Sequence, residues 1–219
     1  MKIDVRTVGA FEENCYLVVD EASGRAVLVD PGDEGSRLVE MVKASGATLD
    51  AIWLTHAHLD HIGAINTVRA AYAVPVHLHP LDLPLYETLS AYSARMYGVP
   101  WDQPDAVPVP FAGGDVLSCG ALQFTVMHVP GHAPGHVSFN GPGVSFSGDL
   151  LFAGSIGRTD IPLADPSAMD ASLERFATLS AATHVYPGHG PATTIGKELE
   201  TNPFLSGRAR TIKHGAPHE

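Results

Sequence analysis

The stretch Thr55–His61 has the sequence THAHLDH and contains four potential metal ligands within six residues. These ligands are His56, His58, Asp60 and His61. Imidazole and carboxylate groups together suit zinc, iron or manganese, and the cluster contains no cysteine, which argues against a closed structural zinc site. The stretch therefore predicts an open metal centre around which the rest of the chain is organised.

The residues on either side of this stretch indicate how the ligands are held. The run Ala51–Leu54 is apolar and rich in strand-forming residues, whereas residues 62–72 have a helical pattern. Because alternate side chains of an extended backbone share one face, the first two histidines can converge on one cation while Leu59 turns into the core. Asp60 and His61 then lie near the first turn of the helix and face a second position. This geometry predicts two metal positions.

The composition limits the class of protein to which this centre can belong. The chain has 219 residues, of which 45% are hydrophobic, so it can bury a sizeable core, and we expect a single domain over residues 1–219. The formal net charge of -11 argues against a nucleic-acid or anionic-membrane surface, since both need clustered Lys and Arg. We expect a small-molecule substrate, no nucleic-acid or membrane partner, and a monomer or small homo-oligomer.

The sequence shows no pattern of export. Residues 1–6 alternate as in a strand and contain no apolar signal-peptide region, and no apolar run is long enough to span a bilayer. We therefore expect a cytoplasmic protein. Cys15 and Cys119 lie far apart and neither belongs to a CxxC pair, so we interpret both as buried free thiols.

The remaining pattern predicts two similar halves in which strands and helices follow one another. Strand patterns occupy residues 3–8, 15–19, 26–29, 74–78, 116–117, 122–129, 137–139, 144–146 and 184–186. A helical pattern occupies residues 35–45, and another helix begins after Asp165 as its N-cap. The segment from Pro80 to Pro110 contains several prolines and aromatic residues, which predicts a partly helical insertion near the active site and a candidate lid.

Further ligand-like residues follow other predicted strands. A loop rich in glycine and proline carries His132 and His136. Asp149 comes directly after a strand and a glycine, and His189 lies in the motif Pro-Gly-His-Gly. Each of these residues lies just past a strand end, on a loop that a rigid sheet can hold still.

These motifs, in this order along the chain, resemble the metallo-β-lactamase superfamily. The resemblance extends over residues 14–204 and implies an α/β (α+β) fold, a four-layer αββα sandwich with its metal site at one edge. It also implies a first metal site, a second metal site and one bridging ligand, formed respectively by His56, His58 and His132, by Asp60, His61 and His189, and by Asp149. We expect two divalent ions, with zinc as the first choice and iron or manganese as alternatives.

Within this superfamily the chain looks similar to hydroxyacylglutathione hydrolase (glyoxalase II), in its short bacterial subgroup. The resemblance rests on four segments, residues 148–152, 154–160, 187–196 and 201–205. It implies hydrolysis of a small thioester, with S-lactoylglutathione as the type substrate. Because only residues 190–219 follow the last ligand, we expect the C-terminal helical domain that full-length glyoxalase II uses to contact glutathione to be missing.

The resemblance also implies a reaction mechanism. Two metal ions that share a water lower its pKa toward about 7, which makes hydroxide available at neutral pH. We expect this bridging hydroxide to attack the carbonyl carbon of the thioester while a metal stabilises the developing oxyanion. Asp60 is the candidate catalytic residue, because it can orient the nucleophile.

Four polar residues outside the ligand set are candidates for supporting roles. Asp30 lies in an Asp-Pro-Gly element that resembles the family's, and we expect it to form hydrogen bonds beneath the site. We expect His136 to fix its loop, because the first metal site is complete without it. Arg158 could meet a substrate carboxylate or form a salt bridge that pins its own loop. Tyr97 could contact the substrate or only pack within the insertion.

A persulfide dioxygenase is the alternative function. Such enzymes resemble this chain in fold and in the Gly-Arg-Thr-Asp segment at residues 157–160, but they use a single iron ion. The motif around His189 completes a second metal site, which favours the hydrolase. A secreted β-lactamase fits less well because a signal peptide is missing and Asp149 stands at the bridging position. A non-catalytic binding module would not need the full set of ligands.

Overall fold

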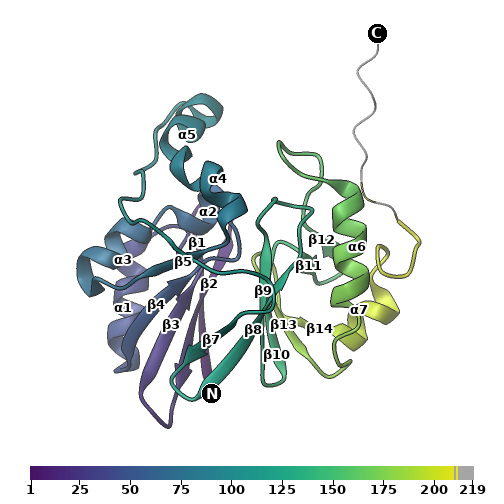
Figure 1. Cartoon of the computed structure of the whole chain (residues 1–219), viewed down its shortest axis with the longest axis horizontal. Helices are drawn as coiled ribbons and strands as arrows, with labels where there is room; N and C mark the ends of the chain where they lie inside the picture. Colours follow the sequence, from purple (N-terminus) through teal and green to yellow (C-terminus); the bar gives the residue numbers. More distant parts are fainter. Residues whose placement is uncertain (210, 212–219) are drawn as a thin grey trace.

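The computed structural model describes residues 1–209 and 211, and it arranges them around two packed β-sheets (Figure 1). The first sheet has the strand order β1 (Lys2–Val8), β2 (Glu13–Asp20), β3 (Arg25–Val29), β4 (Thr48–Trp53), β5 (Val76–Leu78) and β6 (Val109–Pro110). The second has the order β14 (Thr193–Thr194), β13 (His184–Pro187), β10 (Val144–Gly148), β9 (Val137–Gly141), β8 (Leu122–His128) and β7 (Val116–Cys119). A separate ribbon pairs β11 (Leu151–Phe152) with β12 (Ser155–Ile156).

Helices cover the outer face of each sheet and complete four layers (Figure 1). α1 (Gly35–Ser45) and α3 (Ile65–Tyr72) bury their apolar faces against the first sheet. α6 (Pro166–Phe176) and α7 (Ile195–Thr201) contribute to a core on the outer side of the second sheet. The αββα sandwich that the resemblance implies is therefore confirmed. Each half of the chain holds one six-stranded sheet.

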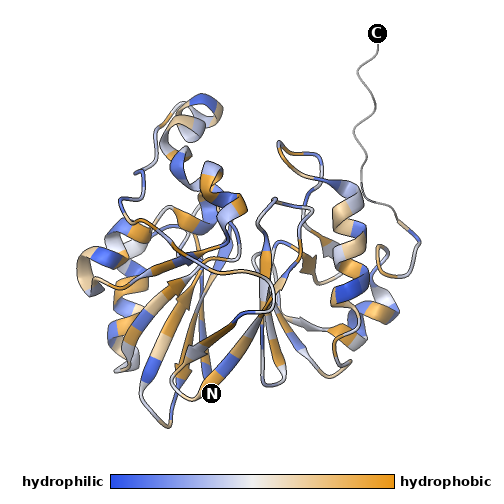
Figure 2. Cartoon of the chain, viewed as in Figure 1, coloured by the Kyte–Doolittle hydropathy of each residue, from blue (hydrophilic) through white to orange (hydrophobic). Residues whose placement is uncertain are grey.

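Aromatic side chains dominate the core between the two sheets. Trp53 packs edge-on against Phe124 at 5.5 Å between ring centroids, and Tyr16 lies 5.3 Å from Phe146. Every residue of β2 is buried, because one face of this strand meets the other sheet and the opposite face meets helices. In Figure 2 the orange of hydrophobic residues recurs along the strands between the helical layers. Each large side chain that is fully buried contributes roughly 1.5–3 kcal/mol. This core holds the strand ends rigidly in place.

The helix predicted over residues 62–72 is broken in the structure. A short helix, α2 (Leu59–Ile62), ends before Gly63, and α3 begins at Ile65. The backbone leaves the helical conformation at Ala64, with φ -99° and ψ 4°, and position 63 is a glycine because a Cβ atom there would lie 2.5 Å from the Trp101 ring. The backbone N–H of Ala64 donates to the carbonyl oxygen of Pro31 at 3.0 Å, which holds the break against the loop beneath it. As predicted, the second pair of ligands lies in the first turn of a helix.

The insertion between Pro80 and Pro110 is partly helical, as predicted. It contains the 3-10 turn η1 (Pro80–Asp82) and the helices α4 (Leu83–Glu87) and α5 (Leu89–Tyr97), which stand above the first sheet in Figure 1. Tyr86 and Leu89 are buried against the core of that sheet, and the Tyr86 hydroxyl donates to the carbonyl oxygen of Ala106 at 3.0 Å. The insertion is thus anchored at its base.

Two smaller predictions are also confirmed. The Asp165 carboxylate caps α6 by accepting backbone N–H groups of Ser167 at 2.8 Å and Ala168 at 3.1 Å. Cys15 and Cys119 are buried free thiols.

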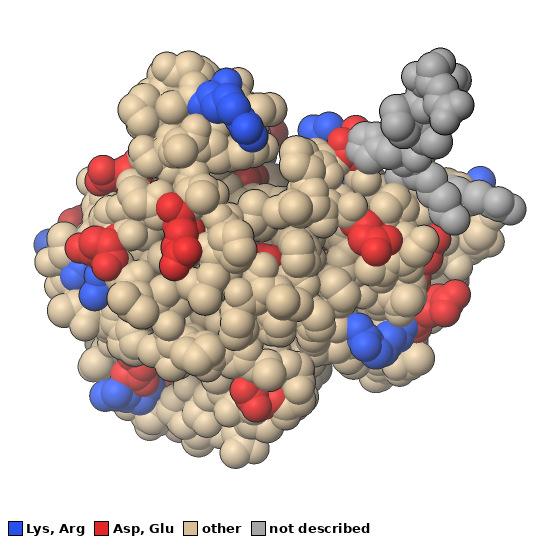
Figure 3. Space-filling view, turned by 45° about the horizontal axis from the view of Figure 1, so that its top comes forward, with Lys and Arg blue, Asp and Glu red and all other residues tan. Residues whose placement is uncertain are grey.

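The surface and the helix lengths give two further observations. On the face drawn in Figure 3, Lys and Arg side chains are scattered, several of them beside Asp and Glu, and they form no large patch. Among the described residues, no helix combines the length and the apolar character that crossing a membrane requires.

Candidate metal centre

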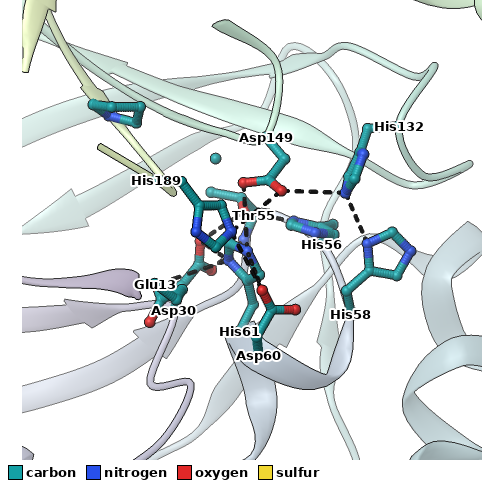
Figure 4. Close-up of polar contacts among 12 residues, drawn as sticks. Glu13, Asp30, Thr55, His56, His58, Asp60, His61, His132, Asp149 and His189 are labelled. Atoms are coloured by element: carbon teal, nitrogen blue, oxygen red, sulfur yellow. Dashed lines mark hydrogen bonds and ion pairs between the residues drawn. The ribbon is translucent and has the colours of Figure 1, made fainter. Parts of the chain in front are cut away.

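Four strand ends meet at one edge of the sandwich and carry the polar residues that the sequence singled out. The Thr55–His61 stretch follows β4, and β8 leads into the loop that holds His132. Asp149 follows β10, and His189 follows β13. In Figure 4 the side chains from these four places point toward one another. The structure therefore brings together all the ligand-type residues that the sequence predicted at this edge.

The first donor set consists of three histidines. Ligand atoms of His56, His58 and His132 all lie within 4.8 Å of one another, and His58 Nδ1 is 2.8 Å from His132 Nε2. His132 Nδ1 donates to the carbonyl oxygen of Arg158 at 2.8 Å, which turns Nε2 toward the centre. Burial lowers the pKa of all three imidazoles, that of His58 to about 3, so they offer neutral lone pairs.

The second donor set contains one carboxylate and two histidines. His189 Nε2 lies 3.3 Å from Asp60 Oδ2, and His61 Nε2 lies 3.9 Å from the same oxygen. Burial alone would lower the pKa of His61, but the carboxylates of Asp149 and Asp60 raise it well above its usual value. This second position therefore favours positive charge.

Asp149 lies between the two sets. Its Oδ2 is 3.3 Å from His132 Nε2 and 3.5 Å from His189 Nε2, and its Oδ1 is 3.5 Å from His61 Nε2. Burial would raise the pKa of this carboxyl group, but the neighbouring imidazoles, His61 first, lower it, so it remains ionised. One carboxylate can thus reach both positions.

The donor atoms fit divalent metal ions. His56 Nε2, His61 Nε2 and Asp149 Oδ1 are buried and lack a hydrogen-bond partner within the part of the chain that the structure describes. Such orphaned buried atoms are rare and need an explanation. Imidazole and carboxylate donors that converge in this way match the ligand preference of zinc and of iron.

Asp30 and His136 support the donor residues from outside. The Asp30 carboxylate accepts the backbone N–H of Thr55 at 2.7 Å and its hydroxyl at 2.6 Å, and it lies 3.1 Å from His61 Nδ1. His136 Nε2 accepts the backbone N–H of Asp149 at 2.9 Å. Asp30 therefore fixes the orientation of the His61 ring, whereas His136 fixes the backbone of Asp149.

Two buried carboxylates near the centre were not predicted from the sequence. Asp82 is fully buried and accepts backbone N–H groups of Ala57 at 3.1 Å and Gly135 at 2.5 Å, which joins the two loops that carry the first donor set. Glu13 is 1% exposed, and one of its oxygens lies 3.9 Å from His61 Nδ1. Burial raises the pKa of Glu13 well above its usual value and that of Asp82 to about 6.

A cavity of about 300 Å³ opens directly onto the centre. Tyr97 and Arg158 both line it, and both are exposed. Arg158 forms a bidentate salt bridge with Asp160, at 2.8 Å from Nε and 3.0 Å from Nη2. Of the two roles that the sequence left open for Arg158, the structure shows the salt bridge. Tyr97 packs edge-on against Phe11, with ring centroids 5.6 Å apart.

Known proteins share both the sequence and the fold. Hydroxyacylglutathione hydrolase GloC of Haemophilus influenzae is 35% identical over 222 residues, which cover 95% of this chain and 100% of that protein. The crystal structure of BLEG-1 B3 metallo-beta-lactamase has a TM-score of 0.88 at 37% identity and covers 94% of this chain and 100% of its own.

Two other solved structures carry information about the centre. TTHA1623 in a di-iron-bound form has a TM-score of 0.85 at 48% identity, covering 92% of this chain and 100% of its own. ETHE1 from Myxococcus xanthus has a TM-score of 0.79 at 29% identity, and the match covers 94% of this chain and 85% of its own. The family model described as "Metallo-beta-lactamase superfamily" matches residues 8–189, which include every donor residue described above. The chain belongs to the metallo-β-lactamase superfamily.

Proposed function

We propose that this protein is a binuclear metal-dependent hydrolase. The observation that carries the proposal is the pair of donor sets with Asp149 between them, close to both. The first ion would be held by His56, His58 and His132, the second by Asp60, His61 and His189, and Asp149 would serve both. Zinc is the proposed metal. Iron is the alternative, since the similar TTHA1623 has a di-iron-bound form.

The residues around the centre suit hydrolysis of a carbonyl compound. When bound, a pair of divalent ions acidifies water and polarises a carbonyl group. Asp60 lines the cavity, and although burial would raise the pKa of its carboxyl group, His61 and His189 lower it. An ionised Asp60 can accept a hydrogen bond from a water molecule and orient that water toward the substrate.

The proposed substrate is a small thioester, S-lactoylglutathione or a related compound. The similarity to hydroxyacylglutathione hydrolase GloC, which extends over almost the whole of both chains, supports this class. The test is hydrolysis of S-lactoylglutathione and simpler thioesters by protein that is stripped of metal and reloaded with zinc or iron. We expect hydrolysis only after reloading. If the protein that is fully loaded with metal hydrolyses none of these thioesters, the proposal is wrong.

A persulfide dioxygenase with a single iron ion is the second candidate, and the similarity to ETHE1 from Myxococcus xanthus favours it. Against it stands the second donor set, because Asp60, His61 and His189 lie within 4.8 Å of one another and would have no role in a one-ion enzyme. Oxygen uptake in the presence of a persulfide separates the two candidates. We expect none above the rate of the metal-free protein.

A further inference from the structure

The cavity in front of the metal centre has mainly apolar walls. One wall comes from α4 and α5, where Leu85, Leu89 and Tyr92 recur at helical spacing and present one face. Further apolar lining comes from Phe152 and Ile161, which lie in and after the β11–β12 ribbon, and Figure 1 shows this ribbon on the other side of the molecule from α4 and α5. A ligand that reaches the centre must therefore lie between two apolar surfaces.

The one cation in this lining is already paired. Arg158 is the only Lys or Arg that lines the cavity within the described part of the chain, and its side chain is 69% exposed. Two of its N–H groups face the Asp160 carboxylate in the bidentate salt bridge. The pair has no net charge, so the cavity wall away from the metal ligands offers little to attract an anionic group.

From this lining we infer the chemical class of the substrate, an inference that rests on the proposed thioester hydrolysis. We propose that the part of the thioester that fills this cavity is uncharged and apolar, an aliphatic or aromatic group rather than the charged glutathione. Glutathione carries two carboxylates and an ammonium group, and burying such charges without partners is unfavourable. Each buried CH₂ group, in contrast, is expected to raise kcat/KM about threefold to fourfold.

Three lactoyl thioesters with different thiols test the inference on the metal-loaded full chain. The thiols are glutathione, the small uncharged N-acetylcysteamine and the aromatic benzyl mercaptan. We expect kcat/KM for the benzyl thioester to exceed that for the glutathione thioester at least tenfold, with the N-acetylcysteamine thioester between them. Equal values, or a preference for glutathione, would overturn the inference.

A charge placed in the cavity wall separates recognition from the intrinsic reactivity of the thioesters. Leu85→Lys adds a cation to the lining, whereas Leu81→Lys adds the same charge at a side chain that is 55% exposed and outside the lining. We expect Leu85→Lys to lower the preference for benzyl over glutathione about threefold, as expected of a partly exposed ion pair, and Leu81→Lys to leave it unchanged. If Leu85→Lys does not fold, Asp160→Asn frees Arg158 and should shift the preference in the same direction.

A binding measurement distinguishes failure of this inference from failure of the proposed function. Thioethers in which a methylene group replaces the thioester carbonyl cannot be hydrolysed, and calorimetry reports their binding directly. If no thioester is cleaved but the benzyl thioether binds more tightly than the glutathione thioether, the proposed function fails and the apolar site stands. Tighter binding of the glutathione thioether would overturn the inference whatever the activity.

Discussion

The two donor sets differ in charge and in exposure. His56, His58 and His132 are imidazoles whose pKa burial lowers, so the first set is neutral. The second set includes the Asp60 carboxylate, and its His189 side chain is 25% exposed. The first set therefore offers lone pairs alone, whereas the second also offers negative charge and lies nearer to solvent. At the two proposed positions, a cation would therefore be held for different physical reasons.

The residues that hold the two donor sets in place also differ. The loops of the first set are joined through backbone N–H groups, which Asp82 accepts. In the second set the His61 side chain is oriented by Asp30 and has Glu13 close by. Changes to the donors and then to these supports should therefore separate the two positions.

The largest effect is expected from removing one donor of each set. His132→Ala and His189→Ala should each lose about one ion per chain and abolish hydrolysis, because each leaves its set with two donors and Asp149. His184→Ala, at an exposed histidine at the start of β13, is the matched control and should keep both ions. Elemental analysis after dialysis measures the loss. Two ions retained in either donor variant would contradict the assignment.

Asp60→Asn tests the catalytic role that distinguishes the second set. The amide keeps an oxygen that can still serve as a ligand, but it has no negative charge and presents an NH₂ group in place of the second oxygen, so it orients the nucleophile poorly. We expect kcat to fall about 10²-fold or more with little change in KM, as is typical when a reacting group is misplaced. Steady-state kinetics on protein of verified metal content measure both constants. An unchanged kcat would remove the proposed role of Asp60.

Asp30→Asn should weaken the second position more than the first. The amide loses part of the bond to His61 Nδ1, and a change of this kind typically costs about 10- to 100-fold in metal affinity. Competition with a chelating dye measures the two affinities separately. Asp33→Asn, three residues along the same loop, is the control. If the metal affinity falls equally at both positions, Asp30 acts mainly through its hydrogen bonds to Thr55 and not through His61.

The smallest effect concerns Asp82, which supports the first set. Burial raises the pKa of this carboxyl group from 3.8 to about 6. The folded chain therefore binds this proton more tightly than the unfolded chain does. The contribution of proton binding to the free energy of unfolding is complete below about pH 4 and is lost as the pH rises through about 6. The loss amounts to about 3 kcal/mol at most.

Asp82→Asn should remove this pH dependence from the metal-free protein. Urea unfolding at pH 5 and pH 7.5 should show the wild type losing more stability across the interval than the variant. Asp102→Asn, at an exposed position in the same insertion, should behave as the wild type does. Identical pH profiles for the wild type and Asp82→Asn would contradict the buried, ionisable role of Asp82.

The strands and the ligand-type residues could be predicted because each signal is local, whereas the αββα arrangement and the grouping of the ligands into two sites were implied by the resemblance to the superfamily. Apolar runs mark the strands, and His56, His58, Asp149 and His189 each follow such a run within a few residues. Asp82 gave no local signal, because its hydrogen bonds reach residues 25 and 53 positions away.

Contacts between residues that lie far apart in the sequence could not be predicted either. At the break between α2 and α3, the backbone N–H of Ala64 donates to the carbonyl oxygen of Pro31, and the Trp101 ring leaves no room for a side chain at Gly63, contacts that only the folded chain brings together. The pairing of Arg158 with Asp160 was one of two open alternatives, since spacing alone does not decide whether a cation faces a neighbour or a ligand.

The central claim, a centre for two metal ions, is tested most directly by the metal content per chain of protein purified without chelator or added metal. The account predicts close to two ions, zinc, iron or a mixture, with both lost together when Asp149 is replaced by Ala. One iron ion per chain, with a second position that stays empty when zinc is supplied, would contradict it and favour the single-iron alternative.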